Sequence, residues 1–377
     1  MNTDEIFAPL RERPVPPLDV DLGRAMATGR RRVRVRRTVA VAGTAAFTTL
    51  AVAVGVMAGT REKPAPPSLG APPGLSCRVS ALPLPPGETQ GGALAVDPSG
   101  RYAVGAVAGS EETGEQGKAL LWDNGRLRVL DVPGFAPTPL AVSSTGVVVG
   151  GVTRDHRLHA WAYVGGKVVT LADDGEGATA NGVNGRGDMV GVVNRPGDIS
   201  HAVMWPAGRP EAVHSLSAPG VAGATAISEA GVVVGFADSR PYVWDSAFKA
   251  GRPLPALSGG SEGGVLGLAG GWVVGTSGPG DRPVVWNLAR DRVEPVTAIK
   301  PAAVTTTGTL VGTSAAAGSA PPYRDASILV GGKARELPHL TERRDTDEAA
   351  GVSADGRVIV GRQATGEGAE TPLLWRC

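Results

Sequence analysis

The distribution of apolar and polar residues divides the chain into two unlike parts. Residues 39–59 contain no charged side chain, which predicts a single apolar helix of about 32 Å at a rise of ~1.5 Å per residue. From about residue 93 onward, short runs of small and β-branched residues alternate with turns rich in glycine. This second pattern is typical of many short β-strands.

The strand-rich part repeats one unit. Each copy contains small and apolar residues, a tight turn that ends in Gly, a short run of mostly β-branched residues and a closing Gly. The copies follow one another at intervals of 37 to 49 residues. The closing glycines of the seven copies are Gly105, Gly150, Gly191, Gly235, Gly275, Gly312 and Gly361.

A second phrase follows each closing glycine and ends in a large residue. These residues are Trp122, Tyr163, Trp205, Trp244, Trp286, Leu329 and Trp375. Turn dipeptides such as Asn124-Gly125 and Gly165-Gly166 come next, and they supply the positive φ that a two-residue hairpin requires. A further short strand follows, as at residues 126–130 and 167–171. Each unit is therefore predicted to hold four antiparallel strands.

A sheet of four short strands is too small to bury both of its faces alone, so like sheets must stack. A period of 40 to 45 residues with four strands is typical of a propeller blade. The sequence thus predicts an all-β fold, a seven-bladed β-propeller of four-stranded antiparallel blades, over residues 77–377. An open β-solenoid is the alternative, although it would need shorter and more regular rungs.

The two ends of the propeller region complement each other. The seventh unit reaches Cys377 directly after its third strand, whereas Cys77 precedes residues 78–82, which match the fourth strand of other units. We therefore expect the N-terminal strand to complete the last blade. Cys77 and Cys377 would then occupy neighbouring turn positions and form a disulfide. Two unrelated buried thiols are the alternative.

This closure also predicts an orientation. The chain ends would lie on the face of the ring that carries the short turns. The longer connections, residues 110–117, 194–200 and 313–324, would lie on the opposite face. We expect that opposite face to be the contact surface, because loops held on a rigid scaffold commonly carry function.

Charge is unevenly distributed. Residues 1–37 carry nine Arg and five acidic groups, and the remaining residues carry 28 basic and 31 acidic groups. Because cationic side chains beside a membrane segment stay in the cytoplasm, we expect 1–37 to be a cytoplasmic tail. Residues 38–59 would be a single-pass transmembrane helix in contact with membrane lipid, and residues 60–76 a Pro-rich linker to an extracytoplasmic propeller. A cleaved signal peptide or a buried core helix is the alternative.

Composition excludes several functional classes. The net charge of +1 gives no support to a nucleic-acid-binding surface, which needs a cationic excess. Gly and Pro together make 86 of 377 residues, and aromatic residues only 4 %, which disfavours helical bundles. Two cysteines cannot form a four-thiolate zinc site.

Candidate chemical groups are few, and no catalytic, cofactor-binding or metal-binding residue is predicted. His159 and His201 are equivalent positions in consecutive units, and His214 and His339 fall in predicted outer strands. The remaining histidine is His156. Carboxylate groups that lack the spacing of a calcium-binding loop are expected in solvated loops, at Glu111-Glu112, Asp173-Asp174 and residues 345–348.

One fragment has a precedent in other propellers. Ser353-Ala354-Asp355-Gly356 matches part of the Asp-box turn of sialidase-like propellers. No other unit repeats this fragment.

His159-Ala160-Trp161 and His201-Ala202-Val203 follow the glycine-closed segments 146–150 and 187–191. On these residues the chain resembles the bacterial extracellular HAF repeat family, named for a His-Ala-Phe phrase, over residues 93–377. Five of the seven units lack the His, and none has Phe third. The resemblance implies an extracytoplasmic, propeller-like repeat domain and no catalytic residue. The usage of Ala, Gly, Val and Arg resembles that of actinobacterial proteins.

These observations favour a membrane-tethered, extracytoplasmic propeller that acts as a non-catalytic binding or scaffold module for a protein, peptide or glycan. No cofactor is expected. One alternative is a hydrolase or lyase with a site in the central channel, and another is a receptor that signals through its Arg-rich tail. Two or more titratable groups facing the channel would favour the enzyme, and an apolar outward patch would favour binding.

Overall fold

The computed structural model describes residues 76–112, 114–173, 176–197, 199–245, 251–315, 324–341, 346–364 and 370–377. The predicted tail at 1–37 and the predicted membrane helix at 38–59 lie outside these ranges. Within them, no helix is long and apolar enough to span a bilayer. Their single helical element is the 3-10 turn η1, Leu288–Arg290.

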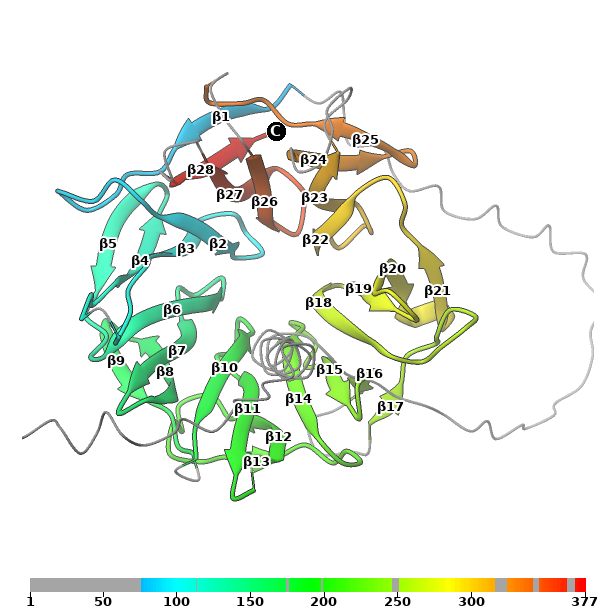
Figure 1. Cartoon of the computed structure of the whole chain (residues 1–377), viewed down its shortest axis with the longest axis horizontal. Coiled ribbons are helices and arrows are strands. Elements are labelled where there is room, and N and C mark those ends of the chain that lie inside the picture. Colours follow the sequence, from blue (N-terminus) through cyan, green and yellow to red (C-terminus); the bar gives the residue numbers. More distant parts are fainter. Residues whose placement is uncertain are drawn as a thin grey trace, which may run out of the picture. The chain divides into compact units, whose positions relative to one another are not determined.

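The described residues form antiparallel sheets arranged around a ring (Figure 1). Five sheets have four strands each, and a sixth has eight strands. In the eight-stranded sheet, two four-stranded groups are joined by one parallel bridge between Arg324 and Thr346. The fold is therefore all-β and propeller-like, with four-stranded antiparallel blades, as the repeat predicts.

The first three sheets contain β2 (Gly92–Val96), β3 (Tyr102–Val107), β4 (Lys118–Asp123) and β5 (Arg126–Leu130); β6 (Phe135–Val142), β7 (Val148–Arg154), β8 (Arg157–Val164) and β9 (Lys167–Thr170); and β10 (Ala178–Val183), β11 (Met189–Arg195), β12 (Ile199–Trp205) and β13 (His214–Ser215). The next two contain β14 (Ala222–Ile227), β15 (Val233–Ala237), β16 (Arg240–Trp244) and β17 (Arg252–Pro253); and β18 (Gly263–Ala269), β19 (Trp272–Ser277), β20 (Arg282–Asn287) and β21 (Arg292–Pro295).

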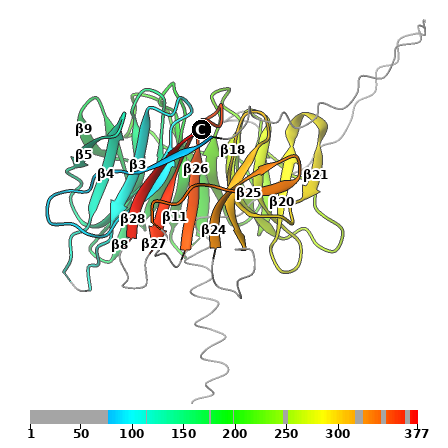
Figure 2. The same ribbon diagram turned by 90° about the horizontal axis from the view of Figure 1, so that it is seen from above.

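The eight-stranded sheet contains β22 (Lys300–Val304), β23 (Leu310–Ala315), β24 (Arg324–Val330) and β25 (Lys333–Glu336), followed by β26 (Thr346–Val352), β27 (Val358–Ala364), β28 (Glu370–Arg376) and β1 (Arg78–Ala81). In every group the first strand lies nearest the centre of the ring (Figure 1). Because the strands alternate in direction, the turns after the first and third strands share one end of the ring, here named the turn face. The opposite end is the connection face (Figure 2).

The closing glycines of the repeat lie where each first strand bulges. In all seven pairs of first and second strands, the register shifts directly after the residue that faces the closing glycine, for example between Ala180 and Gly182 opposite Gly191. A Cβ atom on any closing glycine would lie only 1.8 to 2.1 Å from a carbonyl oxygen of the first strand. The glycine recurs because the bulge leaves no room for a side chain.

We expect Gly191→Ala to destabilise the fold by about 1–3 kcal/mol, the usual cost of overpacking a tight interior. The new Cβ would lie 1.9 Å from the Thr179 carbonyl oxygen. Gly271→Ala is the matched control, because no atom lies within 4 Å of its Cβ position. Thermal unfolding followed by circular dichroism measures both, and equal midpoints for the two variants would contradict the bulge interpretation.

The tryptophans that end the second phrase in five units connect their blades to the preceding ones. All five are fully buried, and each Nε1–H donates to a backbone carbonyl at 2.7 to 2.8 Å. Each acceptor directly follows a buried Leu that comes after the fourth strand of the preceding blade, and this Leu belongs to the same apolar cluster as the tryptophan. The five pairs are Trp122 with Pro83, Trp205 with Ala172, Trp244 with Ser217, Trp286 with Pro255 and Trp375 with Pro338.

Trp205→Phe should lower the free energy of unfolding by about 1–3 kcal/mol more than Trp161→Phe, because it leaves the Ala172 carbonyl without its donor. Trp161 is the matched control, since it is equally buried but its Nε1 has no hydrogen-bond partner within the described part of the chain. Both substitutions remove a similar ring volume. Denaturant unfolding distinguishes them, and indistinguishable losses would count against the inter-blade hydrogen bond.

The N-terminal strand closes the ring as predicted. β1 pairs antiparallel with β28, with Arg78 opposite Arg376 and Ala81 opposite Leu373. A disulfide joins Cys77 and Cys377, whose Cα atoms are 3.9 Å apart. The N–H of Cys377 donates to the Arg357 carbonyl at 2.9 Å, next to the first turn of the last blade. The ends of the propeller therefore lie on the turn face.

Removing this disulfide by the double substitution Cys77→Ser and Cys377→Ser should lower the free energy of unfolding by at most about 5 kcal/mol, because the bond closes a long loop. The thermal unfolding midpoint should fall accordingly. The cysteines are separated by 300 residues. Mass analysis after alkylation with and without reduction reports the pairing directly. Two alkylated thiols in the protein purified without reductant would show that the bond is absent.

Candidate functional site

The seven first strands surround a central cavity of about 460 Å³. The residue displaced by each bulge lines this cavity. The bulge therefore both requires the closing glycine and determines which side chains line the channel. Most of the other lining residues are Ala, Val or Gly. The displaced residues are Leu94, Leu140, Asn181, Thr225, Leu266, Ala302 and Ala350.

Polar groups in this channel bind neighbouring blades together. Glu229 is the single titratable residue that lines the described cavity. Its Oε2 accepts a hydrogen bond from the Gly185 N–H at 2.9 Å, and its backbone carbonyl accepts one from Arg186 Nη1 at 2.7 Å. Asn181 Nδ2 donates to the Ala224 carbonyl at 2.8 Å. Two titratable groups do not converge in the described channel, as general acid–base chemistry would require.

The turns between first and second strands form the mouth of this cavity. In six of them, a buried Asp, Asn, Ser or Thr at the first position accepts a backbone N–H four or five residues later. These residues are Asp97, Ser143, Asn184, Ser228, Thr305 and Ser353. The Asp-box fragment at 353–356 is therefore one instance of a turn hydrogen bond common to most blades, although no other unit repeats its residues.

Asp355 in that fragment interacts with residues of its own turn. Burial raises the pKa of Asp355, but the Arg357 N–H, the Ser353 hydroxyl and the Arg357 charge lower it more, so the net pKa lies below its usual value. Ser353 Oγ donates to Asp355 Oδ1 at 2.7 Å, and the Arg357 N–H donates to the same oxygen at 3.0 Å. This carboxylate stabilises its own turn, so it is a structural group.

The connection face carries exposed aliphatic side chains on three consecutive blades. Leu158 and Ile199 lie where the third strands begin, and Val221 directly precedes β14. They are 39 %, 44 % and 44 % exposed. The predicted long connections at 110–117 and 194–200 lie on this face and are described apart from residues 113 and 198. Of the connection at 313–324, residues 316–323 lie outside the described ranges.

Some carboxylates predicted to be solvated are instead paired with histidine. His159 Nδ1 lies 3.2 Å from Asp173 Oδ2, and His156 Nδ1 lies 3.1 Å from Glu111 Oε2. The Asp173 and Glu111 side chains are only 13 % and 19 % exposed. Both lie in loops as predicted, but they are only partly solvated because residues distant in sequence meet on one blade or between adjacent blades. Asp174 and Asp345 lie outside the described residues.

The prediction for His339 is wrong. The outer strand β25 ends at Glu336, and His339 follows it beyond the strand, whereas His214 does lie in the outer strand β13. His339 Nδ1 bonds to Asp347 Oδ2, and Nε2 bonds to Glu336 Oε1. Asp347, predicted in a solvated loop, is completely buried because β26 carries it against this histidine.

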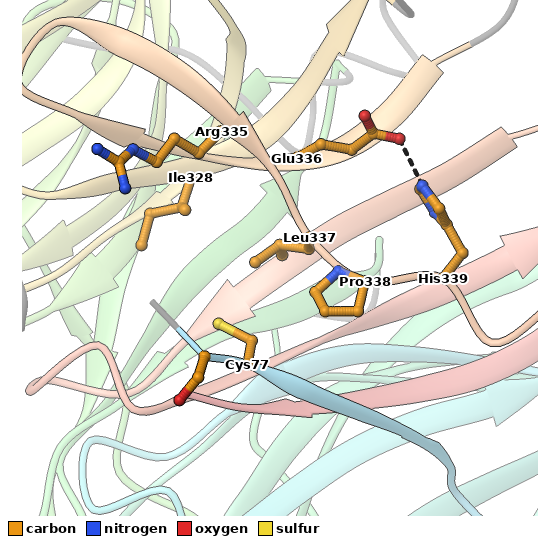
Figure 3. A pocket seen from close by; sticks show the side chains of 8 residues that line it. Cys77, Ile328, Arg335, Glu336, Leu337, Pro338 and His339 are labelled. Atoms are coloured by element: carbon orange, nitrogen blue, oxygen red, sulfur yellow. Dashed lines mark hydrogen bonds and ion pairs between the residues drawn. The ribbon is translucent and has the colours of Figure 1, made fainter. Parts of the chain in front are cut away.

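Asp325 joins this group from β24. One ligand atom each from Asp325, Glu336 and His339 lies within 4.8 Å of the others. Glu336 and His339 line a cavity of about 400 Å³ next to Cys77 and Pro338 (Figure 3). The repeat contains a signal for this cluster, since Asp325 and His339 occupy the positions that His159 and Asp173 hold in an earlier unit.

Comparison with known proteins supports the fold. No family model matches the chain, and no curated protein matches it. The β-propeller domain of the Trilobed protease from Pyrococcus furiosus, which has an open velcro topology, superposes with a TM-score of 0.54 at 10 % identity, over 76 % of this chain and 95 % of that one. In contrast, β1 completes the last blade here.

Two peptidases superpose over 76 % of this chain, which spans only 51 % of each of them. Pyrococcus horikoshii acylaminoacyl peptidase gives a TM-score of 0.52 at 10 % identity, and a puromycin-hydrolyzing peptidase of Mycobacterium tuberculosis gives 0.50 at 15 %. Identities this low concern architecture alone. Together with the sheet topology, these superpositions show that the described part of the chain has a propeller-like fold of four-stranded antiparallel blades.

Proposed function

We propose that this protein is a membrane-tethered, extracytoplasmic, seven-bladed propeller that acts as a non-catalytic binding or scaffold module for a protein, peptide or glycan. The observation that carries the proposal is the apolar channel, in which Glu229 is the single titratable lining residue of the described chain. A scaffold whose centre lacks convergent reactive groups is suited to recognition rather than turnover.

A polypeptide is the favoured ligand class. The exposed large side chains on the connection face include the aliphatic residues Leu158, Ile199 and Val221. Aliphatic groups suit apolar side chains of a peptide or protein, because exposed apolar patches commonly mark protein contacts. Sugar-binding sites, in contrast, depend on polar groups placed to form directed hydrogen bonds.

The membrane tether and the outward orientation rest on charge and hydropathy. The uncharged segment 38–59 and the arginines before it support a single crossing with the N-terminus in the cytoplasm. The ends of the propeller on the turn face support a tether leaving from that side. The connection face would then point away from the membrane.

Seven blades and the HAF resemblance belong to the same proposal. The single bridge between Arg324 and Thr346 supports counting the eight-stranded sheet as two blades. The seven closing glycines and seven bulges support the same number. The histidine phrases at His159 and His201 support membership in the HAF repeat family.

A hydrolase or lyase is the second candidate function. The structural neighbours named above are a protease and two peptidases, which associates propellers of this kind with hydrolysis. A channel site would have to use Glu229, whose carboxylate already accepts the Gly185 N–H. Hydrolysis of peptide or ester substrates by the full chain that Glu229→Gln abolishes would favour the enzyme over the binding module.

The binding proposal is tested by selecting peptides from a displayed library on the full chain in lipid nanodiscs. The triple variant Leu158→Glu, Ile199→Glu and Val221→Glu should weaken the selected peptides by about tenfold or more, since three apolar contacts become charged. Val164→Glu is the control, because this aliphatic side chain is similarly exposed but ends β8 beside the Gly165-Gly166 turn, on the turn face. Equal weakening by the triple variant and by the control, or failure to select any peptide, would contradict the proposal.

A further inference from the structure

A histidine and two carboxylates meet between two neighbouring blades. Asp325 belongs to β24, Glu336 ends β25, and His339 follows β25 after Pro338. Their ligand atoms lie within 4.8 Å of one another. One imidazole and two carboxylates form a donor set that Zn²⁺ and related divalent transition metals accept in proteins.

The second ring nitrogen of His339 is held as in protein metal sites. Nδ1 is hydrogen-bonded to the Asp347 carboxylate, which is fully buried. A metal-binding histidine commonly directs its other nitrogen at a carboxylate, which fixes the ring and its tautomer. This arrangement directs Nε2 towards Glu336 and the cavity (Figure 3). A cation would lie between Nε2 and the Glu336 carboxylate, in place of this hydrogen bond.

The repeat provides an internal comparison for Asp347. In each first strand, the equivalent residue lies two positions before the residue that faces the closing glycine. In the other six units this residue is uncharged: Gly91, Pro137, Ala178, Ala222, Gly263 and Ile299. A blade therefore does not require a carboxylate there, and a buried carboxylate destabilises the fold unless it is compensated. Asp347 is therefore not needed to form the blade, and its role is the contact with His339.

A second unit shows what the cluster adds. In the β6–β9 blade, His159 pairs with Asp173 at 3.2 Å, at the positions that Asp325 and His339 hold. The residue equivalent to Asp347 is there Ala178, and Glu336 has its counterpart in Thr170. The ordinary pair has one carboxylate, whereas the later junction has three around one imidazole.

Access to the cluster is open from the cavity. Glu336 is exposed and His339 is partly exposed, while Asp325 and Asp347 form the buried side. Arg335 also lines this cavity, but its guanidinium extends away from the Glu336–His339 pair (Figure 3). An ion can therefore reach Nε2 and the Glu336 carboxylate without passing this cation.

We propose that Asp325, Glu336 and His339 bind one divalent transition-metal ion, and that Asp347 is the positioning residue that orients His339. The site would connect β24 and β25 to the following blade beside the closure of the ring. It is independent of the binding role proposed above, because its residues neither line the channel nor include Leu158, Ile199 or Val221.

The test is a titration of the tag-free, metal-stripped full chain with Zn²⁺, and with Co²⁺ followed by its visible absorption. We expect one equivalent to bind. Glu336→Gln and His339→Gln should each weaken binding by about tenfold or more, and Asp347→Ala by about 10- to 100-fold, as for other outer-shell partners. Alanine is the residue that two other units hold at this position, so Asp347→Ala is expected to fold.

His159→Gln is the matched control, because it alters the equivalent pair in another blade and should leave the affinity unchanged. Zn²⁺ should also raise the thermal midpoint of the unaltered chain and of His159→Gln, but not that of His339→Gln, because binding stabilises the state that binds. Absence of binding by the unaltered chain, or equal affinity in His339→Gln, would overturn the proposal. Equal loss in His159→Gln would overturn it as well.

Discussion

The pairing of β1 with β28 is the contact on which the ring depends. It supplies the fourth strand of the last blade and carries Leu82 and the Pro83 carbonyl to Trp122 of the first one. The contact between these blades thus repeats the contact between the others, although the chain is interrupted here. The disulfide holds this junction covalently. Hydrogen bonds and apolar contacts therefore both contribute to ring closure.

The bulge in each first strand connects the repeat to the properties of the channel. At the bulge the two strands lie so close together that the facing residue of the second strand must be glycine. The bulge also directs one residue of the first strand towards the centre of the ring. Because those residues are mostly small or aliphatic, the channel is apolar and its polar groups are used between blades. Recognition is thereby left to the faces of the ring, where the connections vary in length and sequence.

Comparison of the repeat units also shows which residues are not needed to build a blade. Most blades place small or apolar residues where β26 places Asp347, and most have no carboxylate like that of Asp325. Such buried charge weakens a sheet unless a partner compensates it. The junction that carries these groups adjoins the ring closure.

The sequence by itself determined the features that recur within one blade: four strands, glycine-closed turns, large residues at the ends of third strands, and the match of residues 78–82 to a fourth strand. These are local periodicities, and each strand encodes which of its faces is buried. Only the tertiary structure decided that Asp173 is paired with His159, that Asp347 is buried, and that His339 meets Asp325 and Glu336. Those contacts depend on how the ends of separate strands and neighbouring sheets pack together, which no pattern within one strand records.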